Sequence, residues 1–249
     1  MNGVGSPEVY PDGSRWLVRS MTLQVNDLDR REVTHIANSF GEQRSEPPKI
    51  YRKTGKRAID VIFVVLALPI VLPLIALLAL VVALDGSNPF YTQNRVGRNG
   101  RVFRIYKLRT MIPNAKARLE DYLSQNSAAR SEWETNQKLR NDPRVTSLGR
   151  FLRNSSLDEL PQLINVLKGD MSLIGPRPMM IEQMPIYPGR AYYDLRPGIS
   201  GPWQVSDRNG TTFAARAKFD TEYHRELSLW VDMKIMARTF GAVVRRTGC

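Results

Sequence analysis

Residues 61–84 form a run of about two dozen residues without a charged side chain, and this run most constrains how the chain can fold. An uncharged apolar run of about 18 residues or more is long enough for a membrane helix. Core helices of soluble proteins seldom run so far without a charge, so a buried helix of a soluble protein is the less favoured alternative. The run therefore predicts a membrane segment.

Basic residues stand on both sides of this run: Arg52, Lys53, Lys56 and Arg57 before it, and Arg95, Arg98, Arg101 and Arg104 after it. Positive flanks mark the cytoplasmic side of a membrane segment. Positive charge at both ends suits a hairpin that returns to its own leaflet better than a single crossing. Pro69 and Pro73 lie near the middle, where each removes a helix hydrogen bond and can bend the axis. We therefore expect a re-entrant helix, with a straight span as the alternative.

The composition of the whole chain favours an anionic partner. Its 249 residues include 36 Lys and Arg against 24 Asp and Glu, a formal net charge of +12. This surplus suits nucleic acid, anionic lipid or a phosphorylated substrate, and does not choose among them. The single cysteine, Cys249, allows no internal disulfide or Cys-based metal cage, and His35 and His224 are too few for a His-rich metal site.

Three regions follow from these patterns. Residues 1–49 show no sustained helical or strand period and no compact apolar core typical of a signal peptide. We interpret them as a flexible N-terminal extension. Residues 50–86 are the expected re-entrant membrane helix. Residues 87–249 are a cytoplasmic domain that contains the candidate catalytic residues and ends in amphipathic helices.

The cytoplasmic domain is predicted to be mostly helical with a small β element, which makes the fold class α+β. Residues 89–111 are expected to form two strands around a turn at Gly97–Gly100, and residues 114–140 a helical hairpin. Residues 213–227 and 229–244 are predicted to be two helices. The strand region carries six basic residues and no acidic one, a surface suited either to lipid headgroups or to a bound phosphate.

The last predicted helix carries an apolar stripe made of Leu229, Trp230, Met233, Met236, Phe240 and Val243. Packing of the stripe on the domain core is the favoured interpretation. A helix that lies in the lipid headgroup region is the alternative, because a membrane segment belongs to the same chain.

An adjacent carboxylate pair, Asp158 and Glu159, marks the densest block of the sequence. Apolar residues at helical spacing predict a helix over residues 157–168, and Pro161 is tolerated only in its first turn. The pair would then lie at the N-terminal end, where backbone N–H groups stabilise negative charge. The purely structural alternative is a capping box formed by Ser156 and Glu159.

Arginines around this pair favour the functional interpretation. Arg150 and Arg153 precede it, and Arg177 follows in the sequence Gly175-Pro-Arg-Pro178, a rigid loop that cannot continue a helix. Two carboxylates among guanidinium groups suit phosphoryl transfer. One carboxylate can attack phosphorus, the other can hold Mg²⁺ or a proton, and the arginines neutralise phosphate oxygens.

A second loop, Arg196-Pro-Gly-Ile-Ser-Gly-Pro-Trp203, is rich in Gly and Pro and suits either a ligand-binding loop or a plain hairpin whose Trp203 covers the core. The chain contains no P-loop motif, no dinucleotide-binding glycine motif and no GxSxG elbow. The enzyme classes that remain are transferases that lack those loops.

Five blocks, in this order, resemble the bacterial sugar transferase family: KRAIDVIFVVLALPIVLPLIALL, YTQNRVGRNGRVFRIYKLRTM, NDPRVTSLGRFLRNSSLDELPQLINVLKGDMSLIGPRP, LRPGISGPWQVSDRN and SLWVDMKIMARTF. These are the monotopic polyprenyl-phosphate phosphoglycosyl transferases that begin exopolysaccharide, O-antigen and glycoprotein glycan assembly. The resemblance covers about residues 52–244. A short-form member is expected, because no multi-span region precedes the apolar run.

The resemblance implies transfer of a sugar-1-phosphate from a UDP-sugar to undecaprenyl phosphate with release of UMP, with galactose or glucose the expected sugar. It implies that Asp158 is the nucleophile, with a covalent phosphosugar intermediate, and that Glu159 assists a Mg²⁺ site formed with Asp158. The expected phosphate-binding residues are Lys107, Arg109, Arg153, Arg177 and Arg196. The resemblance places the helix break of the family at Pro73, where Leu72 replaces the usual Ser, and we expect Pro69 to share the bend.

The implied location is the cytoplasmic face of the bacterial inner membrane. The implied partners are the UDP-sugar, undecaprenyl phosphate and membrane lipids, and nucleic acid is not expected. A homodimer is compatible with the resemblance. The competing class is a membrane-anchored, non-catalytic protein that binds anionic lipid or nucleic acid. That class explains the charge and the apolar run, and leaves the Asp158-Glu159 pair and its arginines as coincidence.

Overall fold

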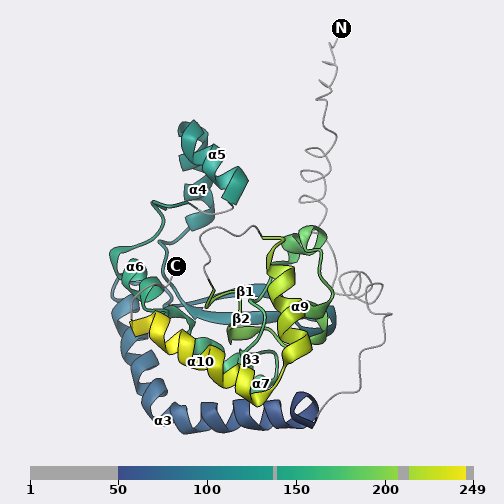
Figure 1. Ribbon diagram of the computed structural model, residues 1–249. Helices are drawn as coiled ribbons and strands as arrows, with labels where there is room; N and C mark the ends of the chain where they lie inside the picture. The colour runs from purple at the N-terminus through teal and green to yellow at the C-terminus, as the bar shows by residue number, and fades with distance from the viewer. Residues whose placement is uncertain (1–49, 137–138, 207–212, 245–249) are drawn as a thin grey trace, which may run out of the picture.

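The computed structural model of the protein describes residues 50–136, 139–206 and 213–244. These residues form an α+β domain that is mostly helical, as the sequence predicts, with two small sheets near its centre (Figure 1). The expected N-terminal extension, residues 1–49, lies outside the described residues.

The predicted membrane segment is one long helix. A single π-helical turn, η1 (Tyr51–Gly55), leads directly into α3 (Lys56–Ala83), which contains both Pro69 and Pro73. Residues 51–83 are long and apolar enough to cross a membrane, and only 6% of their most apolar window is buried inside the protein. A buried core helix would have its apolar residues covered, so that alternative is wrong.

The long helix α3 is bent. Figure 1 shows its first half running beneath the domain and its second half turning upward along the left side. Val64 in the first half packs with Phe103 and Val166, whereas Val82 in the second half packs with Leu108. A straight helix of about 42 Å, at 1.5 Å per residue, could not wrap around one domain in this way.

Buried polar contacts hold the start of α3 against the domain. Asp60 accepts hydrogen bonds from Ser172 Oγ at 2.6 Å and from the backbone N–H of Leu173 at 3.2 Å. Lys56 Nζ lies 2.6 Å from Asp232 Oδ2, and Tyr51 donates to the same oxygen at 2.6 Å. Both acids are almost fully buried, so the first half of α3 is fixed to the domain by ionic and hydrogen-bonded anchors.

The predicted strand pair is confirmed. β1 (Phe90–Val96) and β2 (Val102–Leu108) are antiparallel, with Phe90 opposite Leu108 and Val96 opposite Val102. The turn between them contains a short 3₁₀ segment, η2 (Arg98–Gly100). A second sheet pairs β3 (Ser172–Ile174) with β4 (Gly198–Ser200) in parallel.

The helix predicted over residues 157–168 is divided in two. A 3₁₀ segment, η3 (Leu157–Gln162), is followed by the short helix α7 (Leu163–Lys168). Pro161 has no N–H to donate and its ring crowds the preceding turn, which accounts for the irregular first half. The capping box is also absent: Ser156 has a φ of 57° and its side chain caps nothing, so the pair Asp158 and Glu159 lies at a tight turn, not at a regular helix N-terminus.

The remaining helices surround the sheets. The predicted hairpin over residues 114–140 is confirmed within the described residues as α4 (Ala115–Gln125) and α5 (Ser127–Asn136). α6 (Ser147–Asn154), η4 (Ile181–Ile186) and α8 (Ala191–Asp194) follow. The two predicted C-terminal helices are α9 (Arg216–Glu226) and α10 (Leu229–Val244).

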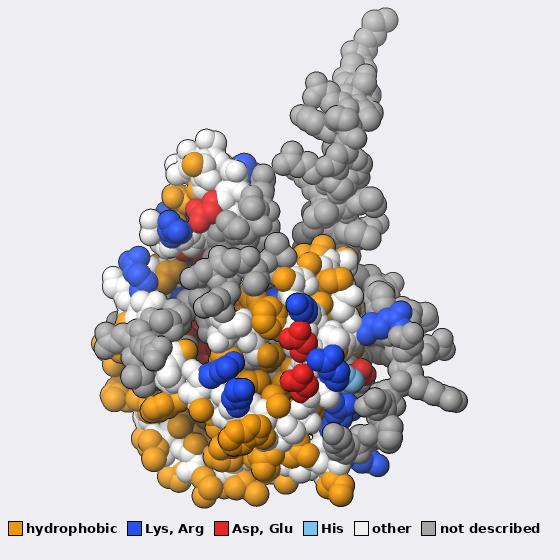
Figure 2. Space-filling view, in the orientation of Figure 1, with side chains coloured by type: hydrophobic (Ala, Val, Ile, Leu, Met, Phe, Trp, Pro, Cys, Tyr) orange, Lys and Arg blue, Asp and Glu red, His pale blue; other side chains and the backbone are white. Residues whose placement is uncertain are grey.

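The apolar stripe of α10 packs on the core only in part: Met236 contacts the cluster around Ile235, whereas Leu229, Trp230, Met233 and Phe240 are exposed. Trp230 is 76% exposed and Phe240 is 73% exposed, whereas Ile235 on another face is buried. Figure 2 shows apolar side chains gathered along the lower part of the molecule, over α3 and α10. The buried contacts of α10 come from Asp232 and Ile235, because the anchor to Lys56 turns that face inward.

Candidate active site

Asp158 and Glu159 lie in η3, directly beneath the β1–β2 hairpin. Asp158 is 7% exposed. Leu157, the residue before the pair, packs against the cluster formed by Ala79, Val82, Leu108 and Leu152. The carboxylates are therefore held next to the second half of the apolar helix α3.

Lys107 links the two carboxylates. Its Nζ lies 2.6 Å from Glu159 Oε1 and 3.8 Å from Asp158 Oδ2. Lys107 is the second-last residue of β2, and strand alternation turns its side chain away from that of Leu108, which is buried under the hairpin. The strand thus places one cation between two acids.

Arg153 comes from the end of α6. Its Nε donates to Thr110 Oγ1 at 2.9 Å, and its charge acts on Asp158. Thr146 caps the N-terminus of α6 by accepting from the N–H of Gly149 at 2.9 Å. A Cβ at Gly149 would lie 2.0 Å from the Thr110 carbonyl oxygen, so only glycine lets α6 approach this closely.

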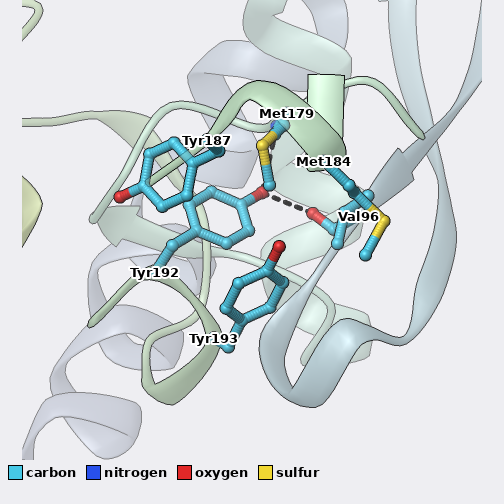
Figure 3. Close-up of a cluster of buried hydrophobic side chains, with 6 residues drawn as sticks. All are labelled: Val96, Met179, Met184, Tyr187, Tyr192 and Tyr193. Carbon is cyan, nitrogen blue, oxygen red and sulfur yellow. Dashed lines mark hydrogen bonds between the residues drawn. The ribbon is translucent and has the colours of Figure 1, made fainter. Parts of the chain in front are cut away.

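Arg177, in the Gly-Pro-Arg-Pro loop, also lies close to the pair. Its Nη2 is 4.0 Å from Glu159 Oε1, and the side chain is 39% exposed. The loop after it is fixed by a buried cluster (Figure 3): the N–H of Met179 donates to Tyr192 Oη at 3.0 Å, and that hydroxyl donates to the Val96 carbonyl. The exposed guanidinium therefore extends from a rigid backbone.

Burial dominates the electrostatics of Asp158. It raises the pKa of the Asp158 carboxyl above its usual range, and the neighbouring charge of Glu159 acts in the same direction. Lys107, Arg153 and Arg177 oppose this rise. The expectation that a helix dipole and nearby cations would dominate is therefore incomplete, because desolvation of the carboxylate is the larger effect.

Two of the arginines expected at the phosphates make their hydrogen bonds with other parts of the chain. The guanidinium of Arg109 donates to the carbonyls of Val82 and Asn88 and forms an ion pair of 2.6 Å with Asp85, so it closes the end of α3. Arg196 donates to the Gly169 carbonyl at 3.0 Å, at the far end of α7. The structure thus brings together Asp158, Glu159, Lys107, Arg153 and Arg177, and leaves Arg109 and Arg196 apart from them.

The carboxylate pair fits a magnesium ion only in part. Within the described residues no group of three or more His, Cys, Asp or Glu side chains could hold a metal. Mg²⁺, however, is often bound by one or two carboxylates together with substrate phosphates and waters. Glu159 is already paired with Lys107, so Asp158 is the better placed ligand for such a site.

Sequence reasoning missed three side chains that shape this region: Thr110, which fixes Arg153, and Arg95 and Arg216, which bond to the carbonyls of the Arg177 loop. Thr110 follows the basic Lys-Leu-Arg stretch and could have been noticed there. Arg95 stood out only as one of the basic residues of the strand region and Arg216 carried no local signal, because both reach the loop only through the tertiary fold.

Fold and site together define a class: an α+β domain attached to a long exposed apolar helix, with a buried carboxylate pair faced by cations. The chain belongs to the bacterial sugar transferase family, whose sequence model matches residues 51–246.

Several named proteins are similar to this chain. A UDP-galactose-lipid carrier transferase of Erwinia amylovora is 43% identical over 195 residues, which are 78% of this chain and 41% of that protein. The exopolysaccharide production protein ExoY of Sinorhizobium fredii is 43% identical over 197 residues, 78% of this chain and 87% of that protein. A UDP-glucose:undecaprenyl-phosphate glucose-1-phosphate transferase of Caulobacter vibrioides is 37% identical over 203 residues, 77% of this chain and 70% of that protein. The chain spans about two fifths of the length of its longer relatives.

Proposed function

We propose that this protein is a phosphoglycosyl transferase that moves a sugar-1-phosphate from a UDP-sugar to undecaprenyl phosphate, in exopolysaccharide or related glycan synthesis. The observation that carries the proposal is the buried Asp158, set among Lys107, Arg153 and Arg177 beside the apolar helix α3. The names of the relatives support a galactosyl or glucosyl phosphate as the transferred group.

In the proposed first step, an Asp158 carboxylate oxygen attacks the sugar-linked phosphorus of the UDP-sugar. A bond forms between that oxygen and phosphorus, and the bond from phosphorus to the bridging oxygen breaks. UMP leaves with the electron pair. Lys107 and Arg177 would offset the repulsion between the carboxylate and the diphosphate. Burial raises the pKa of Asp158, so its ionised carboxylate is a stronger nucleophile than an exposed aspartate would be.

In the second step, a phosphate oxygen of undecaprenyl phosphate attacks the same phosphorus. The bond between Asp158 and phosphorus breaks, which releases the lipid diphosphate sugar and restores the carboxylate. The lipid would reach the site along the second half of α3, since Leu157 and Leu108 at the site pack on that part of the helix.

Mg²⁺ is part of the proposal. Asp158 would hold it together with the phosphates of the substrate, and Glu159 would contribute if Lys107 released it. The ion would supply positive charge to the phosphate oxygens. Lys107 and Arg153 would hold the two carboxylates in place for this arrangement.

We further propose that α3 is re-entrant, so that both of its ends lie on the cytoplasmic face of the inner membrane. The bend of α3 and the packing of its two halves on the same domain support this. The exposed apolar side chains of α10 would rest on the same membrane surface.

The transfer is tested by release of UMP when the purified chain in nanodiscs receives undecaprenyl phosphate, Mg²⁺ and UDP-galactose or UDP-glucose. Asp158→Asn should abolish turnover and leave UDP-sugar binding nearly unchanged, because size and shape are kept. Glu159→Gln should also cripple the reaction. Asp170→Asn is the matched control, since Asp170 is a half-buried carboxylate paired with the exposed Lys168, outside the candidate site, and the change should leave the rate unchanged.

The covalent step is tested by mass spectrometry of enzyme quenched with UDP-sugar and no acceptor. A sugar-phosphate adduct on the peptide that contains Asp158 is the expected result. Full activity of Asp158→Asn would refute the scheme. Saturation kinetics that require both substrates bound at once, without an adduct, would argue for direct displacement.

The topology is tested by cysteine labelling from the periplasmic side in intact cells, after Cys249 is replaced by Ser. Lys53→Cys and Arg101→Cys should both be protected, because both flanks of the helix lie in the cytoplasm. Reactivity at one flank alone would establish a crossing helix. A chain that binds anionic vesicles and releases no UMP from any UDP-sugar would favour the non-catalytic binding protein.

A further inference from the structure

Arg216, in the first turn of α9, is a buried cation that the proposed chemistry does not use. The residue is 5% exposed. Its guanidinium carbon lies 5.0 Å from the ring centre of Trp203 and 5.0 Å from the ring centre of Phe213. The two rings therefore hold the guanidinium between them, and cation–π attraction is strongest where water is excluded.

One hydrogen bond connects the guanidinium of Arg216 to a residue of the candidate site. Its Nη2 donates to the carbonyl oxygen of Arg177 at 2.7 Å. Arg177 is the residue whose own guanidinium approaches Glu159. Arg216 thus fixes the peptide plane from which the Arg177 side chain extends.

The other hydrogen bonds that hold this loop act on the residues before and after Arg177. The N–H of Gly198 donates to the Pro176 carbonyl at 2.8 Å. Arg95 donates to the Pro178 carbonyl at 3.3 Å, and the Val96 N–H donates to the Met179 carbonyl at 2.9 Å. Both come from β1. Among the residues that the structure describes, the contact to the Arg177 carbonyl itself comes from α9 alone.

The charge of Arg216 is partly balanced by a buried carboxylate on the same helix. Asp220, one helical turn later, is fully buried, attracts Arg216, and accepts a hydrogen bond from the Tyr187 hydroxyl at 2.6 Å. Repulsion from the charge of Arg177 contributes, after burial, to lowering the pKa of Arg216. A phosphate bound at Arg177 would reduce that repulsion, because its negative charge offsets the two positive charges.

We propose that Arg216, held between Trp203 and Phe213, is a positioning residue that sets Arg177 for binding the diphosphate of the nucleotide sugar. This inference rests on the proposed function and adds a residue from α9 to its binding site. It also gives Trp203 a role, because its ring contacts the side chain that orients Arg177.

The test is a double-mutant cycle with Arg216→Lys and Arg177→Ala. Lysine keeps the charge but lacks the planar fork that stacks and donates at the same time. Arg216→Lys should raise KM for the UDP-sugar and lower kcat/KM tenfold or more. In the Arg177→Ala background the same change should cost less than twofold, because the group that Arg216 orients is gone. A side chain with a merely structural role would give losses that multiply.

Two further variants keep the test decisive if Arg216→Lys folds poorly. Phe213→Leu removes one face of the stack and should raise KM for the UDP-sugar in the same direction. Arg144→Lys is the matched control, because Arg144 is also buried and lies 5.2 Å from the ring centre of Trp133. It should reduce stability without changing that KM.

Binding of UDP, measured by calorimetry across the same cycle, separates this inference from the proposed function. If the wild type binds UDP and releases UMP but the two losses multiply, the role of Arg216 is overturned while the proposed function stands. If the wild type neither binds UDP nor releases UMP, the proposed function fails and the inference fails with it.

Discussion

Replacement of Lys107 by Met removes the cation that lies between the two carboxylates of the candidate site. The side chain keeps most of its length, so packing against the hairpin changes little. Glu159 then loses an ion pair of 2.6 Å, and Asp158 loses a positive charge at 3.8 Å. The change tests whether the site depends on compensation between buried charges.

The expected size follows from the distances. Two unit charges about 4 Å apart attract by about 4 kcal/mol at an effective dielectric constant of 20. Removal of one partner of a buried pair typically costs about 3 kcal/mol or more, because the other charge stays buried and unpaired. Both side chains of the Lys107–Glu159 pair are less than one fifth exposed, so solvent screens this pair only weakly.

The stability cost of Lys107→Met should also depend on pH. Burial already raises the pKa of Asp158, and Lys107 is the strongest influence that opposes the rise. Without Lys107 the pKa should rise further, so the folded state binds a proton more readily than the unfolded chain. Stability is then lost as pH increases from the ordinary aspartate pKa of about 3.9 through the raised pKa of Asp158. The cost of Lys107→Met should therefore be smallest near about pH 4 and grow toward neutral pH.

The assay is unfolding of the protein in nanodiscs over this pH range, compared with Lys168→Met. Lys168 is 50% exposed and lies 3.7 Å from Asp170, so its loss should cost about 1 kcal/mol or less at every pH. The reasoning is refuted if Lys107→Met costs no more than this control, or if its cost does not change with pH.

Three other predictions use features outside the carboxylate pair. Burial raises the pKa of Asp220 to about 6 from its usual 3.8, so wild-type stability should fall as pH rises between these values; Asp220→Asn should flatten that part of a melting-temperature series. Gly149→Ala places a Cβ 2.0 Å from a backbone carbonyl and should cost about 2 kcal/mol or more, whereas Gly241→Ala, with nothing within 4 Å, should be neutral in the same unfolding assay. Pro69→Leu with Pro73→Leu should straighten the long helix, and periplasmic labelling of a cysteine at one flank in some molecules would report the change.

Local patterns predicted the local elements well. The sequence predicted the paired strands, the helical hairpin and the division between the last two helices. These elements could be predicted because turn residues and apolar spacing act over a few residues. The irregular η3 was not predicted, since Pro161 and the positive φ of Ser156 depend on how the chain turns between α6 and α7. The same limit applies to α10, whose inward face is chosen by the contact of Asp232 with Lys56, 176 positions away in the chain.

The sequence by itself determined which residue types could perform phosphate chemistry: an acidic pair followed by an arginine loop, and an apolar helix with basic flanks. It also pointed to Arg153 and Arg177, and the family resemblance implied Lys107; the fold brings all three to that pair. Only the tertiary structure decided that Arg109 closes the end of α3, that Arg196 lies at the far end of α7, and that Arg216 reaches the Arg177 carbonyl. The physical reason is range: periodicity and turn chemistry act between near neighbours, whereas the partner of a long charged side chain is set by segments that meet only when the chain is folded.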